Sequence, residues 1–266
     1  NLEKNEELKS ILIQETPWLR DAQSETEQKK RIALLFDLNK LKNDQDNAFN
    51  KLVQNQMSSG AWAWFNGGPE NRFITQHIIT GLGHLAKLTS TTASEGKSNS
   101  TISHDPKEQQ MIAKAVTYLD EEFVKEYEQM KKYARSLNDD HLSPTQLHYL
   151  YMRSFYQDIK TPKKVNEIMD FYKTQAQKYW VKRDLYSKGL IALFLYRNDN
   201  TATANKIIKS LEENSITSEE LGMYWKENTN SWYWYQAPIE TQSLLIEAFS
   251  EIKNDVTTVD NLKIWL

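Results

Sequence analysis

Three carboxylates close to predicted helix starts could carry acid–base chemistry: Asp139, Asp140 and Glu240. Paired carboxyl groups inside a barrel of helices would suit a glycosidase or a polysaccharide lyase, where one group acts as an acid and the other as a base or nucleophile. That chemistry depends on the distance between the groups, which the sequence does not contain. Glu240 near a helix start is also explained by the helix dipole, which stabilises a carboxylate there. We therefore expect no catalytic residue.

Metal chemistry finds little support in the sequence. His77 and His84 are seven residues apart, as are His141 and His148, whereas zinc ligands on one helix are usually four apart. Position 143 is a serine, so Asp139 and Asp140 lack the third carboxylate of an Asp-Asp-x-x-Asp magnesium site. The chain has no cysteine, which excludes disulfides, thiol nucleophiles and thiolate zinc sites. We expect no metal or cofactor, and hydrogen-bonded structural roles for the histidines.

Two tryptophan-rich segments resemble each other and indicate an internal repeat. Each contains a Trp-x-Trp pair, and each precedes a Thr-Gln pair (Thr75-Gln76 and Thr241-Gln242) at the start of a strongly apolar helix. A degenerate repeat of this kind indicates an architecture of repeated supersecondary units. The residues of interest are Gln56, Gly60, Trp62, Trp64 and Phe65 in the first copy and Trp232, Trp234 and Tyr235 in the second.

The aromatic residues of the repeat have two interpretations. Exposed tryptophans often anchor partner proteins, so the pairs could form a recognition surface. They could instead pack the ends of helical hairpins, with each indole N–H bonded to a carbonyl or a glutamine. We favour packing.

The composition excludes several classes of partner. The 266 residues carry a formal net charge of −3, so no basic face is available for nucleic acid or anionic lipid. A mean hydropathy of −0.71 without a long apolar run predicts no membrane span. No signal peptide is recognisable, and the charged start is typical of a mature or excised segment.

Proline and glycine placement predicts an all-α fold. There are only 8 glycines and 6 prolines, and no segment alternates convincingly between apolar and polar residues. The prolines stand at expected helix starts, as in Asp105-Pro106, Ser143-Pro144 and Thr161-Pro162, where the preceding side chain can cap the helix. Ala237-Pro238 fits the same pattern without a capping side chain.

The predicted helices fall into two kinds. One kind has a single apolar stripe and should face both core and water, whereas the other is apolar on most faces and should be buried on several sides. The first kind comprises Glu25–Lys42, Pro106–Tyr133 and Ala202–Glu213, and the second Phe73–Leu88, Tyr186–Tyr196 and Leu244–Ile252. We expect antiparallel hairpins in two layers, with the buried helices inside. This α/α toroid would be one domain over residues 1–266, with a mobile polar loop at Thr89–His104.

Several stretches resemble a known family. Gln56 to Trp62 is similar to the Gln-x3-Gly-x-Trp repeat of α/α-toroid proteins such as the squalene and terpene cyclases. More specifically, Ser59–Pro69 followed by Arg72–Leu85 resembles the thioester-type helical domain of bacterial alpha-2-macroglobulin proteins of the Bacteroidetes type. Gln14–Leu19, Glu25–Leu38 and Trp232–Gln242 resemble the same family.

The resemblance implies an endopeptidase inhibitor that traps proteases. Proteins of this family change shape after bait cleavage and enclose or covalently capture the attacker, in the periplasm or cell envelope and in some cases from a lipid anchor. The family's reactive Cys-x-Glu-Gln motif is absent here, since the chain has no cysteine. We therefore expect a non-catalytic structural domain, part of a larger protein, whose partners are the other domains and, through the full-length protein, proteases. The alternatives are a carbohydrate-active enzyme on an α/α barrel and a protein-interaction scaffold.

Overall fold

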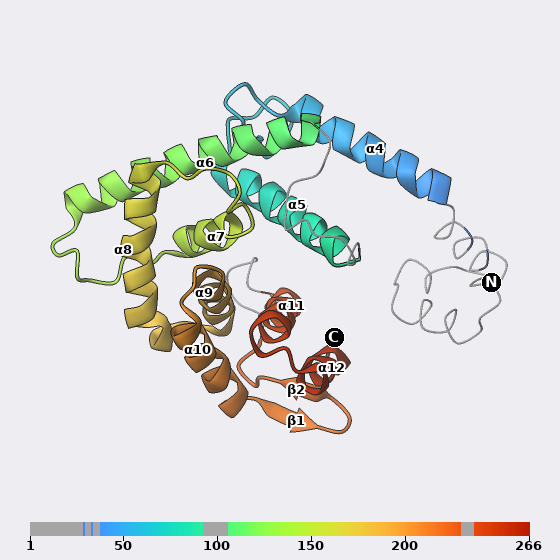
Figure 1. The fold of residues 1–266 in the computed structure, drawn as a ribbon, viewed down its shortest axis with the longest axis vertical. Coiled ribbons are helices and arrows are strands. Elements are labelled where there is room, and N and C mark those ends of the chain that lie inside the picture. Colours follow the sequence, from blue (N-terminus) through green and yellow to red (C-terminus); the bar gives the residue numbers. More distant parts are fainter. Residues whose placement is uncertain (1–28, 30–32, 34–37, 93–105, 230–236) are drawn as a thin grey trace. The chain divides into compact units, whose positions relative to one another are not determined.

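The computed structural model describes Lys29, Ala33 and residues 38–92, 106–229 and 237–266 (Figure 1). Two compact units, Asn1–Gln56 and Met57–Leu266, are considered separately. Helices dominate the described residues, which confirms the all-α prediction. None of these helices combines the length and apolar content that crossing a bilayer would require.

The first unit contains helix α4, Leu38–Asn55. The sequence predicted a helix that ends at Lys42, and that end is wrong because α4 continues for a further 13 residues. Its later part is rich in asparagine and aspartate, yet Phe49, Leu52 and Val53 keep the helical spacing of apolar residues and are half-buried or nearly so. Most of the predicted segment before Leu38 lies outside the described residues.

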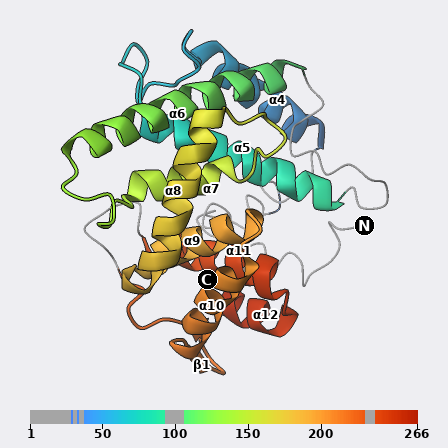
Figure 2. The same cartoon turned by 60° about the vertical axis from the view of Figure 1, so that its left-hand side comes forward.

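The second unit holds the remaining described helices (Figures 1 and 2). They are α5 (Arg72–Thr92), α6 (Pro106–Tyr133), α7 (Pro144–Arg153), α8 (Lys163–Tyr179), α9 (Leu185–Arg197), α10 (Thr201–Glu213), α11 (Pro238–Ala248) and α12 (Val256–Ile264), with a 3-10 turn at Trp180–Lys182 and a π-helix at Phe249–Lys253. The prediction for α6 is confirmed at both ends, and those for α9 and α10 within one residue. The predicted loop at Thr89 begins too early, since α5 runs to Thr92; residues 93–105 are not among those described.

Three of the predicted proline positions are helix starts. α6, α7 and α11 begin at Pro106, Pro144 and Pro238. At Thr161-Pro162 the prediction is wrong, because α8 begins at Lys163 with no side-chain cap and Thr161 Oγ1 accepts from Arg153 instead. The Ser143 side chain caps α7 by accepting a hydrogen bond from the Gln146 backbone N–H at 3.3 Å. Gln146 does not complete a capping box, because its amide donates to Glu126 at 2.6 Å instead.

A short hairpin was not predicted. Strands β1 (Ile216–Ser218) and β2 (Gly222–Tyr224) pair antiparallel, with Thr217 opposite Met223. Three residues are too few to show a period of two, so the sequence pattern does not reveal them. The following Trp225 is buried, and its indole N–H donates to the Leu211 carbonyl at 2.8 Å.

Four helices of the second unit form a row in chain order, in which α5 contacts α7, α7 contacts α9 and α9 contacts α11. α6 packs on α5 and α7, while α10 packs on α9 and the π-helix. The row helices are the apolar ones; α9, for example, buries Leu185, Ser187 and all of Gly189–Leu195. α9 is therefore buried on several sides as predicted. The same prediction is wrong for α5, where Leu85 is 59% exposed.

The four helices of the row run in the same direction. Near the starts of α5 and α7, the Gln76 amide donates to the Thr145 carbonyl at 3.4 Å. Further along the same two helices, His84 meets Tyr151 at 2.6 Å. Between α9 and α11, Gly189 faces Leu244, and the last residue of α9, Arg197, pairs with carboxylates beyond the middle of α11. The starts of α7 and α9 line one pocket, and at their ends Arg197 donates to the Ser154 hydroxyl at 3.1 Å. The row therefore has one amino-terminal end and one carboxyl-terminal end.

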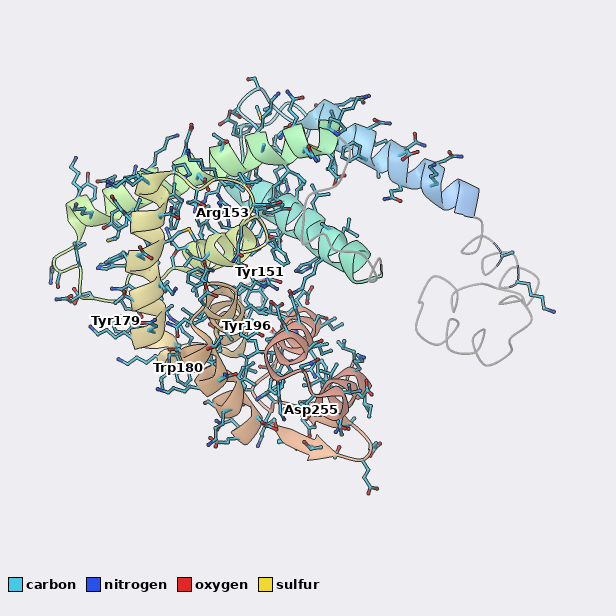
Figure 3. The ribbon with its side chains drawn as sticks, in the orientation of Figure 1. Tyr151, Arg153, Tyr179, Trp180, Tyr196 and Asp255 are labelled. Carbon is cyan, nitrogen blue, oxygen red and sulfur yellow. The ribbon has the colours of Figure 1, made fainter. Side chains whose placement is uncertain are left out.

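A buried ion pair fixes α7 against α6. Arg153, at the end of α7 (Figure 3), points its Nε at Asp120 Oδ1, 3.3 Å away, and its Nη2 donates at 2.9 Å to Ile159 O and to Thr161 Oγ1. The Tyr149 hydroxyl also donates to Asp120. Burial raises the pKa of Asp120, an effect that the Arg153 charge and these hydrogen bonds oppose. The pair is structural, since both side chains are almost inaccessible to solvent.

Candidate functional site

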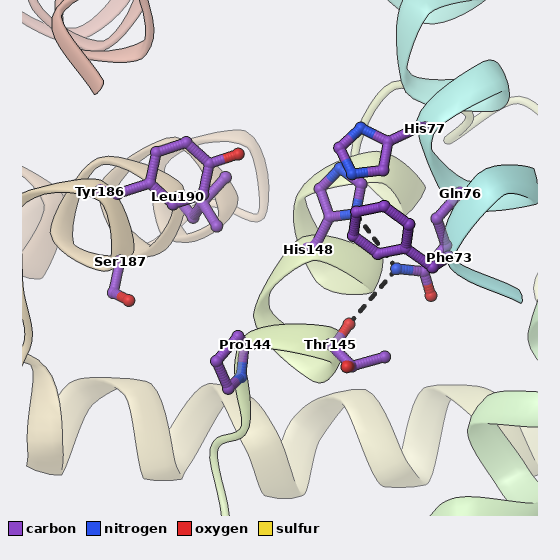
Figure 4. Close-up of a pocket in the computed structure, with 9 residues that line it drawn as sticks. All are labelled: Phe73, Gln76, His77, Pro144, Thr145, His148, Tyr186, Ser187 and Leu190. Atoms are coloured by element: carbon purple, nitrogen blue, oxygen red, sulfur yellow. Dashed lines mark hydrogen bonds between the residues drawn. The ribbon is translucent and has the colours of Figure 1, made fainter. Parts of the chain in front are cut away.

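Polar and aromatic side chains gather at both ends of the row. The pocket cluster lies at the amino-terminal ends and consists of Phe73, Gln76, His77, Pro144, Thr145, His148, Tyr186, Ser187 and Leu190 (Figure 4). The ionic cluster lies toward the carboxyl-terminal ends and consists of His84, Lys87, Tyr151, Arg197, Glu247 and Glu251.

The two Thr-Gln pairs occupy equivalent places. Thr75-Gln76 and Thr241-Gln242 are the fourth and fifth residues of α5 and α11, and all four side chains are buried. Each glutamine amide donates to main-chain carbonyls of other elements, which for Gln242 are those of Met223 at 2.9 Å and Leu262 at 3.0 Å. The second glutamine thus repeats the structural role of the first, which is to tie its helix to the main chain of another element.

The tryptophan motif divides between core and surface. Trp62 is 3% exposed, and its backbone N–H donates to Thr75 Oγ1 at 3.0 Å. Trp64 and Phe65 are 58% and 64% exposed on the loop that follows. Gly60, in the same loop region, has a φ of +97°.

The other residues of the motif are placed as follows. Gln56 closes the first unit, and its N–H donates to the Leu52 carbonyl at 3.1 Å. Trp232, Trp234 and Tyr235 lie outside the described residues. Packing therefore stays a prediction for these three residues.

His148 is held as a neutral ring in the pocket cluster. Thr80 donates its hydroxyl proton to the Gln76 carbonyl at 2.7 Å, so it accepts from His148 Nε2 at 3.3 Å. His148 Nδ1 then accepts from the Gln76 amide at 3.2 Å, and Gln76 Oε1 accepts from Arg72 Nε at 2.8 Å. Burial, followed by the neighbouring His77 and Arg72, lowers the pKa of His148 to about 3.

Rings form the rest of the pocket wall. The His77 ring lies 4.2 Å from Phe73 and 4.4 Å from His148, centroid to centroid, and burial lowers its pKa. The Ser187 hydroxyl donates to Asp184 at 2.9 Å. The enclosed space is about 60 Å³. This is below the roughly 150 Å³ of a cavity that admits benzene, so the pocket is too small for a sugar ring or an organic cofactor.

Arg197 organises the ionic cluster by binding two carboxylates. Its Nε and Nη2 donate to the two Glu251 oxygens at 2.9 and 2.8 Å, a bidentate arrangement. Nη2 also contacts Glu247 at 2.5 Å, and Lys87 forms a second ion pair with Glu251. Burial alone would raise the pKa of Glu251, but Arg197 and Lys87 outweigh it and lower the pKa. The π-helix carries Glu251, and π-turns often occur at functional sites.

Tyr151 links the same cluster to α5. Its hydroxyl donates to Glu247, so His84 Nε2 is the donor in the 2.6 Å contact with the tyrosine oxygen. Burial lowers the pKa of His84 despite the opposing Glu247 charge, which agrees with a neutral ring. Burial and Glu247 raise the pKa of Tyr151 far above its usual value. Both carboxylates of the cluster are engaged by cations or hydroxyls.

The carboxylates singled out in the sequence lie elsewhere. Asp140 pairs with Arg183, Asp139 is exposed in the loop before α7, and Glu240 is exposed in the first turn of α11. No hydrogen bond or ion pair of the described residues joins any two of the three. The structure instead brings together Glu247 and Glu251. Their only sequence signal is a four-residue spacing within an otherwise apolar helix.

Metal ligands are likewise not assembled. In residues 38–92, 106–229 and 237–266, no group of three histidine or carboxylate side chains has the geometry to hold an ion.

The buried His148 should make stability depend on pH. Its folded pKa of about 3 lies below the unfolded value of roughly 6.5. The unfolded chain therefore binds the proton first, and stability present above pH 6.5 is lost as the pH falls toward 3. We expect a loss of about 2–3 kcal/mol between pH 6.5 and 4.5, measured by urea unfolding. In His148→Gln, whose amide can keep both hydrogen bonds, this slope should flatten; an unchanged slope would contradict the assignment.

No known protein-family model matches the chain, and no curated protein is detectably similar to it.

Proposed function

We propose that this chain is a structural helical domain of an alpha-2-macroglobulin-type protease trap and that its second unit forms part of an α/α toroid. The observation that carries the proposal is the equivalence of Thr75-Gln76 and Thr241-Gln242 at the same positions of two helices in a parallel row. An α/α toroid has this organisation, with parallel inner helices and outer helices that return between them. The tryptophan-rich motifs that resemble the family precede the same two pairs.

A non-catalytic role agrees with the chemistry of both clusters. The polar atoms of Gln76 and His148 bind one another, the side chains of Arg72 and Thr80, and the Thr145 carbonyl. The carboxylates of Glu247 and Glu251 are neutralised by Arg197 and Lys87. Such groups fix the relative positions of helices. In the proposed trap the domain would serve as a rigid element of the cage, in the periplasm or cell envelope.

The trap proposal is tested with the full-length protein that contains this domain. A protease enclosed by it should lose activity toward a protein substrate while keeping activity toward a small peptide substrate, because only the large substrate is excluded. Equal loss of both activities, or of neither, would contradict enclosure.

The isolated chain should neither inhibit a general protease nor become covalently attached to it. Covalent capture needs an acyl group activated by a departing thiolate, and the chain has no cysteine. Mass spectrometry after mixing with trypsin, and separately with methylamine, should show the unmodified mass. A protease adduct on this chain would refute the assignment. The same sample on a glycan panel should show no turnover; hydrolysis lost in Glu240→Ala would favour the carbohydrate-active alternative.

A further inference from the structure

Three buried polar atoms between α5, α6, α7 and α8 have no protein partner. They are Arg72 Nη2, Gln146 Oε1 and the Tyr172 hydroxyl. The Arg72 side chain is 9% exposed, Gln146 is 7% exposed and Tyr172 is fully buried. A buried polar atom without a hydrogen bond costs about 1–3 kcal/mol, so three in one region require an explanation.

The orientation of these groups is fixed by their other contacts. Arg72 donates from Nε to Gln76 and forms an ion pair with Glu126 through Nη1. Gln146 must turn its amide N–H toward Glu126 Oε2, 2.6 Å away, because its carbonyl oxygen would be repelled by the carboxylate. Neither side chain can rotate to give its unpaired atom, Arg72 Nη2 or Gln146 Oε1, a hydrogen bond without losing its contact with the Glu126 carboxylate. Nη2 therefore stays a free donor and Oε1 a free acceptor.

The side chains that carry these unpaired atoms meet around Glu126. Arg72 Nη1 and Gln146 Nε2 contact the same oxygen of Glu126. Phe123 connects Tyr172 with this region. Its ring lies 5.5 Å from that of Tyr172 in a tilted arrangement and stacks on that of Tyr149 at 4.0 Å, centroid to centroid. The Arg72 guanidinium lies over Tyr149, 5.9 Å from the ring centre.

Glu126 and Arg72 both affect the pKa of Tyr172. Burial is the main cause that raises the pKa of Tyr172 to about 12, with a further rise from Glu126 and an opposing effect of Arg72. The hydroxyl can both donate and accept a hydrogen bond.

We propose that a buried water molecule occupies this region, accepts a hydrogen bond from Arg72 Nη2, donates one to Gln146 Oε1 and exchanges one with the Tyr172 hydroxyl. Water fits because a buried water usually makes about three hydrogen bonds to otherwise unsatisfied groups. An anion would be repelled by Glu126 and a cation by Arg72, whereas a neutral donor–acceptor suits both. The water completes the chain of contacts that orients Arg72, and through it Gln76 and His148 of the pocket cluster.

Crystallography identifies the occupant directly. A high-resolution crystal structure should show a density peak at hydrogen-bond distance, about 2.7–3.2 Å, from Arg72 Nη2 and Gln146 Oε1. A crystal soaked in bromide should show no anomalous signal there. An empty region, or bromide in it, would overturn the proposal.

The substitution Tyr172→Phe gives a second test, in which the direction of the change in Tm decides. If the hydroxyl binds water, its removal should lower Tm by about 2–4 °C, as for the loss of one buried hydrogen bond. If the hydroxyl has no partner, its removal should raise Tm instead, which would overturn the proposal. Tyr156→Phe is the matched control, since the Tyr156 hydroxyl is equally buried and donates to the Ile79 carbonyl at 2.6 Å. It should lower Tm.

Discussion

Replacing Arg197 with methionine should destabilise the protein by about 3 kcal/mol. Methionine keeps much of the side-chain volume but leaves Glu247 and Glu251, 20% and 18% exposed, with Lys87 as their remaining cation. The cost is high because a partly buried carboxylate that loses its partner keeps its desolvation penalty. Urea unfolding followed by circular dichroism gives the change in unfolding free energy.

Two further variants show whether the effect comes from the carboxylates. Adding Glu251→Gln to Arg197→Met should recover part of the loss, since the double variant leaves one carboxylate instead of two to share Lys87. Lys209→Met is the control: its pair with Glu213 is exposed at both ends, so the cost should stay below about 0.5 kcal/mol. Equal costs for Arg197→Met and Lys209→Met would refute the role given to the ionic cluster.

Replacing Gly60 with alanine should cost about 3 kcal/mol or more. At φ = +97° a side chain is strained, and a Cβ atom here would lie 2.4 Å from the Lys114 carbonyl oxygen of α6. The backbone at Gly60 and the backbone at Lys114 cannot move apart without shifting the loop that carries Trp62. Thermal unfolding of the variant should show a clear fall in Tm.

Substitutions at two other glycines separate the two causes of this destabilisation, which are backbone strain and the steric contact with α6. A Cβ at Gly67, where φ is +78°, meets no atom within 4 Å, so Gly67→Ala should show the cost of backbone strain alone, about 1 kcal/mol. Gly81 lies inside α5 with open space around it, so Gly81→Ala should stabilise by about 0.5–1 kcal/mol. A Gly60→Ala variant no less stable than Gly67→Ala would show that the contact with α6 is not restrictive.

Local signals predicted most of the described helices, because they act within a few residues. Pro106 marks the start of α6, and the continuous apolar pattern marks α9. Where the local signal is weak the prediction failed: the polar residues after Lys42 concealed the rest of α4, and three-residue strands concealed the hairpin. The α/α toroid remains a prediction.

The clusters could not be predicted because they depend on distant residues. Glu247 and Glu251 stand within a segment that reads as apolar, and nothing near them indicates Arg197 as a partner. The sequence spacing relates His77 to His84 on its own helix, whereas the His77 ring lies against His148 on the next helix of the row. Spacing along one helix cannot report contacts between parallel helices.

The row of helices has a consequence for how the chain folds. Its members are never adjacent in sequence, so their contacts join distant residues: Gln76 and His148 are 72 positions apart, and Tyr151 and Glu247 are 96 apart. Closing such long loops is slow, whereas the pairing of α9 with α10 is local. We expect neighbouring helices to pair early and the ionic cluster to assemble late. The substitution Arg197→Met should then raise the unfolding rate far more than it lowers the refolding rate.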